Sequence, residues 1–186
     1  MFNKFTIREL VFISLMSALI FVFNLIFGGA IVAATGIPLS SAFVSAILFG
    51  IAVIFVTKIV PKFGTWTILL LIYSILEMPT SLGGAPGFWP KIPINLITGI
   101  LADIVLYLIR YRTVGSFFAF YVLATANIVT FAFFLWLLNF PGVDKLISLM
   151  PIMIPVYWAV GTVGIILGLF IWNRMKDKRI IKQIID

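Results

Sequence analysis

The sequence predicts an all-α membrane protein in which six transmembrane helices, with both termini in the cytoplasm, form a single domain. Of its 186 residues, 63% are hydrophobic and only 10% are charged, whereas soluble domains have about 45–50% apolar and about 25% charged residues. The apolar residues form continuous runs, most of them close to the ~20 residues that a helix needs to cross a bilayer. Six runs and their short connections use nearly the whole chain, so we expect one integral membrane domain over residues 1–186.

Glycine and proline residues separate the apolar runs and set the expected bounds of the helices. Backbone polar groups inside lipid need internal partners, so each run should be helical. The alternating pattern of an outer-membrane barrel strand is absent from these continuous runs. The expected spans cover about 7–28, 38–57, 65–78, 92–109, 114–138 and 151–173.

The first run resembles the core of a signal peptide in its position, but not in its length. From Leu10 to Phe27 it is continuously apolar apart from short polar residues, and it exceeds the 7–15 residues of a typical signal-peptide core. Further spans follow it. We therefore expect a retained first helix.

Basic residues orient the chain. With the N-terminus inside, all but two of the 13 lysine and arginine residues fall on the cytoplasmic side, as the positive-inside rule requires. The two exceptions are Lys91 and Lys145. Residues 174–186 are expected to form a basic cytoplasmic tail. The net charge of +7 then serves topology and contact with anionic lipid headgroups, and nucleic acid is not an expected partner.

The third span is shorter than the others. Its 14 residues, Thr65 to Met78, give roughly 21 Å of helix against a hydrocarbon core of about 30 Å. Pro79 ends it, and the stretch from Pro79 to Lys91 is too rich in glycine and proline to continue as a helix. Irregular backbone at membrane depth is tolerated where it is buried in protein or lines a cavity. We therefore expect an external cavity covered by this loop, with the connection from Gly28 to Ile37 as a possible lid.

Glu77 is the most conspicuous candidate for ligand binding. It lies about 12 residues, or roughly 18 Å, from the cytoplasmic start of its helix. An ionisable group at that depth usually faces a cavity or a partner. A ligand-binding carboxylate and a structural ion pair with Lys91 are both compatible with this position.

Two amides and one acid extend the polar set. Lys91, Asn95 and Asp103 fall on one face of the fourth span, and Asn95 is near its external end, where it could contact a ligand. Asp103 is expected to be structural, with Tyr107 or Arg110 as its partner. Asn127 lies near the middle of the fifth span, where ligand contact and helix association are equally compatible with the sequence.

Aromatic residues are expected to gather at the same external side. Trp89, Tyr157 and Trp158 suit either an interfacial belt or a stacking platform for a flat ligand. Small residues follow Tyr157 on the sixth span: Gly164 and Gly168 are spaced for close helix packing. Ala42, Ala46 and Gly50 give the second span a similar face, and the sequence does not say whether its partner is in this chain.

A search for catalytic and metal-binding motifs is negative. The 186 residues contain no cysteine and no histidine, which removes thiol chemistry and the commonest metal ligand. No phosphate-binding loop, HExxH motif or nucleophile elbow is present. None of the six acidic residues pair at a spacing suited to acid–base work or a divalent metal. We expect no enzyme activity, no cofactor and no metal site.

Six short helices, inside termini, the small pair Ser14-xxx-Ala18 on the first helix and the Gly/Pro loop from Pro79 to Lys91 together resemble the substrate-binding S components of energy-coupling factor (ECF) transporters. In that family the first-helix motif is typically Ala-xxx-Ala and meets the coupling transmembrane subunit. Ser14 replaces the first alanine here and is still small.

The resemblance implies a prokaryotic plasma-membrane protein that captures a vitamin or related micronutrient from outside. One transmembrane coupling subunit and two ATPase subunits would drive its uptake. The positions matching the family's ligand site are Glu77, Trp89, Lys91, Asn95, Asn127, Tyr157 and Trp158. Family members for nickel or cobalt use an N-terminal histidine motif, which this chain lacks. A self-sufficient small carrier or channel remains the alternative, and a membrane-embedded enzyme is the least favoured class.

Overall fold

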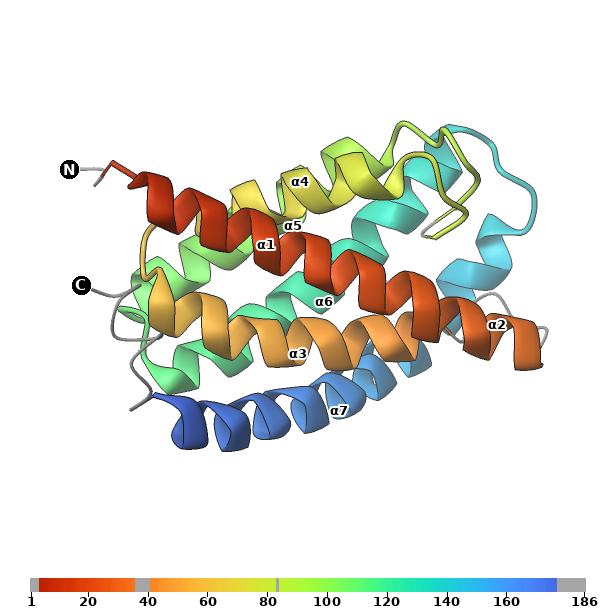
Figure 1. The fold of residues 1–186 in the computed structure, drawn as a ribbon. Coiled ribbons are helices and arrows are strands. Elements are labelled where there is room, and N and C mark those ends of the chain that lie inside the picture. Colours follow the sequence, from red (N-terminus) through yellow and green to blue (C-terminus); the bar gives the residue numbers. More distant parts are fainter. Residues whose placement is uncertain (1–3, 36–40, 83, 177–186) are drawn as a thin grey trace.

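The computed structural model describes residues 4–35, 41–82 and 84–176, and within them the chain is a bundle of helices with no strand (Figure 1). The helices follow the chain in the order α1 (Ile7–Phe23), η1 (Asn24–Gly28), α2 (Gly29–Thr35), α3 (Ser41–Ile59), α4 (Thr65–Glu77), α5 (Lys91–Leu108), α6 (Thr113–Leu137) and α7 (Val143–Met175). The predicted all-α class is confirmed for these residues.

Five helical segments are long and apolar enough to cross a membrane, and α4 is a shorter apolar helix. With 13 residues, α4 is about 20 Å long, so the predicted short apolar helix is confirmed. The bounds of α3, α5 and α6 agree with the predicted spans to within three residues. The predicted total of six crossings and the direction of the chain through the membrane stay predictions.

The first helix is longer than predicted. It runs without interruption from Ile7 to Thr35, through a single π-helical turn, η1. The sequence analysis expected a connection between helices from Gly28 to Ile37. This expectation was wrong for residues 28–35, which are helical. Gly28 lies within this helix. Close packing favours glycine at this position, because a Cβ there would lie 2.8 Å from Oδ1 of Asn24 and 3.2 Å from Cβ of Ser41. The rest of the proposed lid, 36–37, and the predicted start of the second span, 38–40, lie outside the described residues.

The last helix also begins earlier than predicted. It starts at Val143, after Gly142 in the left-handed region, and contains Pro151 and Pro155 in its interior. Pro151 was predicted to begin the helix. Membrane helices tolerate internal proline because neighbouring groups and local adjustments satisfy the freed carbonyls, and here that tolerance outweighs proline as a stop signal.

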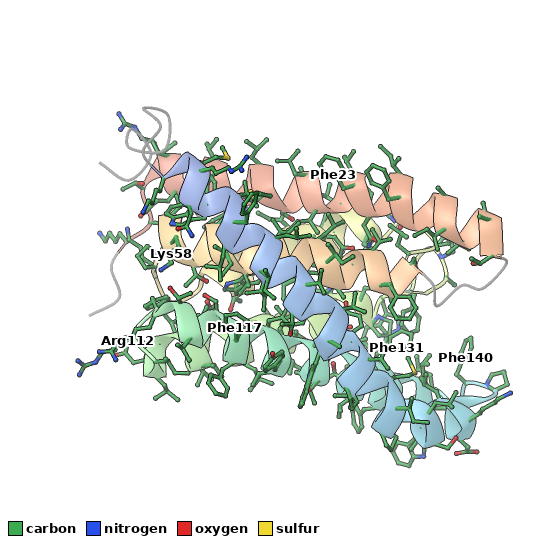
Figure 2. The ribbon with its side chains drawn as sticks, turned by 90° about the horizontal axis from the view of Figure 1, so that it is seen from below. Phe23, Lys58, Arg112, Phe117, Phe131 and Phe140 are labelled. Atoms are coloured by element: carbon green, nitrogen blue, oxygen red, sulfur yellow. The ribbon has the colours of Figure 1, made fainter. Side chains whose placement is uncertain are left out.

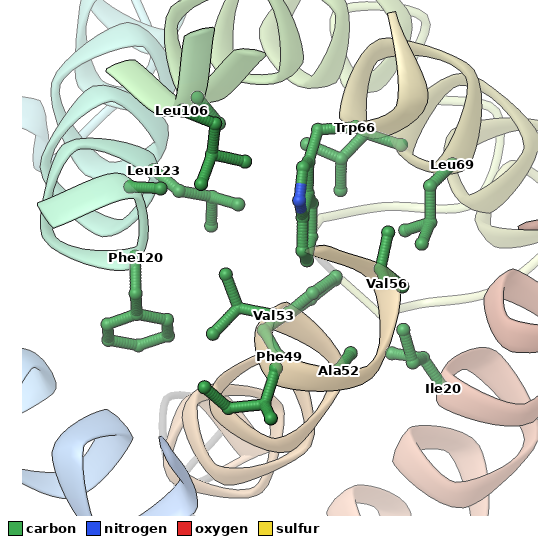
Figure 3. Packing of buried hydrophobic residues seen from close by; sticks show 14 of the residues in the cluster. Ile20, Phe49, Ala52, Val53, Val56, Trp66, Leu69, Leu106, Phe120 and Leu123 are labelled. Carbon is green, nitrogen blue, oxygen red and sulfur yellow. The ribbon is translucent and has the colours of Figure 1, made fainter. Parts of the chain in front are cut away.

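Each helix packs against its neighbours in a layered bundle. α5 lies between α4 and α6, α1 lies against α3 and α4, and α7 lies along α3 and α6. The buried centre is filled by apolar side chains from α1, α3, α4, α5, α6 and α7. Part of it is seen in Figure 3, where Trp66 of α4 faces Val53 of α3 and Phe120 of α6 lies beside them.

The close contact between α3 and α7 depends on glycine. A Cβ on Gly50 would lie 2.4 Å from the carbonyl oxygen of Gly161, and a Cβ on Gly164 would lie 2.4 Å from the carbonyl oxygen of Ile47. The small faces predicted on the second and sixth spans therefore meet each other within this chain. Such faces let backbones approach closely in lipid.

The two ends of the bundle differ in charge. The first turn of α1 and the last turn of α7 lie at the same end (Figure 1). Lys58 and Arg112 lie at that end too, whereas Phe131 and Phe140 lie at the other (Figure 2). At the basic end, Lys62 forms an ion pair with Glu9 at 2.7 Å. This grouping is the one that the orientation prediction requires.

Candidate ligand-binding cavity

A cavity of about 560 Å³ lies in the half of the bundle away from the basic end, between the helices and the loop after α4. Its size falls within the ~300–1,000 Å³ of small-molecule sites. Apolar side chains such as Phe49, Leu70 and Phe131 make up much of its wall. The polar and ionisable lining residues are Asn24, Ser41, Ser45, Tyr73, Glu77, Ser81, Lys91, Asn95, Thr98, Asn127 and Tyr157.

The Gly/Pro loop covers this cavity, as predicted. Ser81, Leu82, Gly84 and Ala85 belong to the lining, and the yellow-green segment after α4 turns back toward α6 in Figure 1. Gly84 has a φ of 127°, which L side chains rarely adopt. Glycine at position 84 therefore allows the loop to turn there, where another residue would be strained.

Lys91 holds the loop to the end of α4. Its Nζ donates to the carbonyl oxygen of Glu77 at 3.1 Å and to that of Thr80 at 2.9 Å. Lys91 is 2% exposed. A cation suits the carbonyl end of a helix, where the helix dipole is negative. The ammonium group is thus engaged with backbone oxygens.

The carboxylate of Glu77 is left facing the cavity. The side chain is 6% exposed and lines the cavity, yet its carboxylate forms no hydrogen bond or ion pair with the residues that the structure describes. The suggested structural ion pair with Lys91 is therefore not what the structure contains, because Lys91 binds the Glu77 carbonyl. The Lys91 ammonium acts on this carboxylate through space, but no described residue donates to it, and a buried carboxylate without a donor is costly. A ligand group can supply that donor.

Asn24 and Tyr73 are cavity residues that the sequence analysis missed. Nδ2 of Asn24 donates to the hydroxyl of Tyr73 at 2.8 Å, and both residues line the cavity. An asparagine inside a long apolar run was the available signal, and so was the spacing of Tyr73 and Glu77, one turn apart on α4.

The remaining predicted residues of the cavity come from three helices. Asn95 of α5, Asn127 of α6 and Tyr157 of α7 all line it. The ring of Tyr157 lies parallel to that of Phe120, with centroids 6.2 Å apart. The structure therefore brings Glu77, Lys91, Asn95, Asn127 and Tyr157 to one cavity.

The two predicted tryptophans lie elsewhere. Trp89 is 55% exposed and packs edge-on against Phe134. Nε1 of Trp158 donates to the carbonyl oxygen of Tyr121 and the hydroxyl of Thr125, between α6 and α7. Neither side chain belongs to the cavity lining. Each lies on a side of its segment that does not face the cavity.

Asp103 has a structural position, with partners different from those predicted. Instead of Tyr107 or Arg110, its carboxylate accepts the backbone N–H groups of Trp66 at 3.1 Å and Thr67 at 2.9 Å. It is fully buried. These amides begin α4, so Asp103 caps this helix from α5.

Ser14 and Ala18 lie on α1 away from the cavity. Ser14 is exposed and donates to the carbonyl of Leu10, one turn earlier, and Ala18 is half-buried. Val11 and Leu15 next to them are 60% and 57% exposed. This side of α1 has no covering element in the described part of the chain.

The cavity offers a ligand hydrogen-bonding groups and an apolar wall. The described residues contain no cluster of side chains that could hold a metal ion. The fold and the cavity define a multi-helix integral membrane protein with room for a small ligand. A family model described as "Hypothetical bacterial integral membrane protein (Trep_Strep)" matches residues 7–182. The chain belongs to this family. Searches of curated proteins and of solved structures found no match.

Proposed function

We propose that the protein is the substrate-binding S component of an ECF-type importer. It captures a vitamin or related small micronutrient at an external cavity, and partner subunits drive its uptake with ATP. The observation that carries this proposal is a ligand-sized cavity, covered by a loop, whose wall contains the buried carboxylate of Glu77, to which none of the described residues donates a hydrogen bond.

The position of the cavity supports import rather than export. It lies in the half of the bundle away from the basic residues, and the positive-inside rule places that half outside. A ligand would therefore be bound from the outside. The loop that covers the cavity would open for entry.

The chain supplies binding but no source of energy. Its 186 residues contain no phosphate-binding loop, so ATP-driven uptake requires an ATPase from another subunit. The open, apolar side of α1 around Ser14 and Ala18 is where we propose that the coupling subunit docks.

Equilibrium binding by the purified protein in detergent or nanodiscs tests the proposal. A panel of vitamins, including thiamine, riboflavin, biotin and pyridoxine, would be titrated against the wild type. We expect one of them to bind tightly and Glu77→Gln to weaken it by tenfold or more, which corresponds to about 1.4 kcal/mol. Glu9→Gln makes the same change at the basic end and should leave the affinity unchanged.

Liposome flux separates this proposal from a self-sufficient carrier or channel. An S component without partner subunits should bind its ligand and show no sustained uptake. Ligand flux through the isolated chain with no ATPase present would contradict the proposal and favour the carrier.

A further inference from the structure

The π-helical turn in the first membrane helix places an unpaired acceptor at the cavity. Asn24 begins η1 and is 3% exposed. Its Nδ2 donates to the hydroxyl of Tyr73, but its Oδ1 is buried and has no hydrogen-bond partner among the described residues. Isolated π turns in α-helices often occur at functional sites.

The space around this oxygen is defined by Gly28. A Cβ at position 28 would lie 2.8 Å from Oδ1 of Asn24 and 3.2 Å from Cβ of Ser41. A larger residue would therefore push the amide from its place. Gly28 keeps Oδ1 where it is, next to Ser41 at the cavity wall.

The Glu77 carboxylate is a second cavity acceptor, near Asn24, that has no hydrogen-bond donor among the described residues. Tyr73, to which Asn24 donates, lies one turn before Glu77 on the same face of α4, and all three residues line the cavity. Neither the amide oxygen of Asn24 nor the carboxylate of Glu77 accepts a hydrogen bond from the part of the chain that the structure describes. The one lysine of the cavity is held by backbone carbonyls.

This arrangement favours one kind of ligand. Unpaired buried acceptors are costly, and a ligand N–H group can recover that cost. The Glu77 carboxylate would repel an anionic group placed against it. Groups that bring N–H donors, neutral or cationic, therefore fit this wall best.

We propose that Asn24 and Glu77 form a subsite for an amino-substituted nitrogen heterocycle, in which a ligand N–H group donates to Oδ1 of Asn24 and a second donates to Glu77. The inference rests on the proposed function and specifies its ligand chemistry. It also assigns Asn24 as a ligand-contacting and specificity-determining residue on the first membrane helix.

Matched pairs of small probes test the subsite directly. 2-Aminopyrimidine and 4-aminopyrimidine, each compared with its N,N-dimethyl analogue, differ in N–H donors and keep the same ring. Ligand-observed NMR with the purified protein gives their relative affinities. We expect the amino compounds to bind at least tenfold more tightly, and benzoate, an anion of similar size, to bind more weakly than they do.

Two variants locate the discrimination. Asn24→Leu removes the acceptor, so the ratio between amino and dimethylamino probes should fall to about one. It also leaves the Tyr73 hydroxyl without its Asn24 donor, so we expect a lower melting temperature of the ligand-free protein. The ratio compares two probes on the same variant and is therefore read independently of that loss. Gly28→Ala should lower the same ratio by displacing the amide.

Gly29→Ala is the matched control. It makes the same change one residue later, where a Cβ would meet nothing within 4 Å, so the wild-type ratio should persist.

The outcomes distinguish this inference from the proposed function. Equal affinity for both members of each pair, or an unchanged ratio in Asn24→Leu, overturns the subsite. Tight binding of a vitamin without any preference for the amino probes also overturns it and leaves the proposed function standing. If the wild type binds neither the vitamins nor the probes, both fall.

Discussion

Asp103 of α5 and Thr67 of α4 are joined by two hydrogen bonds, one from the Thr67 backbone N–H at 2.9 Å and one from its hydroxyl at 2.7 Å, both to Oδ2 of the carboxylate. At the other end of α4, Lys91 of the same α5 donates to the Glu77 carbonyl. α5 thus places a negative group at the N-terminus of α4 and a positive group at its C-terminus. Both charges match the helix dipole.

This pairing explains how a helix too short to span the bilayer is held in place. The first N–H groups and last C=O groups of a helix have no partners within it, and inside a membrane water does not supply them. Lys91 and Asp103 are 12 residues apart, or roughly 18 Å along α5, close to the length of α4. Glu77 is thereby fixed at the cavity.

The first prediction is that Asp103→Asn destabilises the protein. An asparagine has one acceptor oxygen where the carboxylate uses two, so at least one N–H or hydroxyl of α4 loses its partner. We expect a loss of about 1–3 kcal/mol, seen as a lower melting temperature in detergent. Asp144→Asn, an exposed acid at the start of α7, should change stability by less than about 0.5 kcal/mol; equal effects of the two variants would show that the cap has no special importance.

A second prediction concerns Lys91→Met, which keeps the length of the side chain and removes its ammonium. The carbonyls of Glu77 and Thr80 then lose their donor, and the loop after α4 loosens. We expect faster proteolytic cleavage between residues 80 and 90 and a weaker ligand affinity. Lys145→Met, at an exposed position in α7, serves as the control, and an unchanged cleavage rate in Lys91→Met would contradict the role given to the ammonium.

Much of the fold could be predicted because lipid imposes a simple rule on the backbone. Continuous apolar runs gave the helices, and their lengths identified α4 as the short one. The errors occurred where proline and glycine were read as breaks: Pro151 and Gly28 both lie within helices. Tertiary contacts help decide such positions, as the approach of Gly28 to Ser41 of α3 shows.

The cavity could be predicted only in part. Glu77 stood out because a charge in an apolar segment needs a reason, and Asn95 and Asn127 followed the same logic. Asn24 obeys that logic too, but its contact with Tyr73 joins residues 49 positions apart, which no local pattern reveals. The tryptophans show the opposite error: an aromatic near the right depth faces the cavity only if its helix is turned toward it.

A third prediction tests the glycine contact between α3 and α7. Gly164→Ala would place a Cβ 2.4 Å from the carbonyl oxygen of Ile47, and a backbone atom cannot move aside as a side chain can. We expect a loss of about 1–3 kcal/mol from overpacking, measured by thermal unfolding in detergent. Gly29→Ala adds the same methyl group in open space; if it destabilises the protein as much, the cost lies in helix propensity and not in the contact.

A fourth prediction concerns orientation. The sequence contains no cysteine, so single-cysteine variants can be labelled without background. In intact cells, a membrane-impermeant maleimide should react with Lys145→Cys at the cavity end and should reach Arg112→Cys only after permeabilisation, as the positive-inside rule requires. Labelling of Arg112→Cys in intact cells would reverse the topology and place the cavity on the cytoplasmic side.

The last prediction concerns the uncovered side of α1. If the coupling subunit packs there, small residues are needed for close approach, and Ser14→Leu together with Ala18→Leu should prevent assembly. Ligand binding by the isolated chain should persist, because neither residue lines the cavity. Co-purification with candidate coupling subunits measures assembly, and titration with the vitamin panel measures binding.

Phe118→Leu, at an exposed site on α6, is the control and should leave both assembly and ligand binding unchanged. Assembly that survives the double variant would place the coupling surface on another helix, since two leucines would hold the backbones apart.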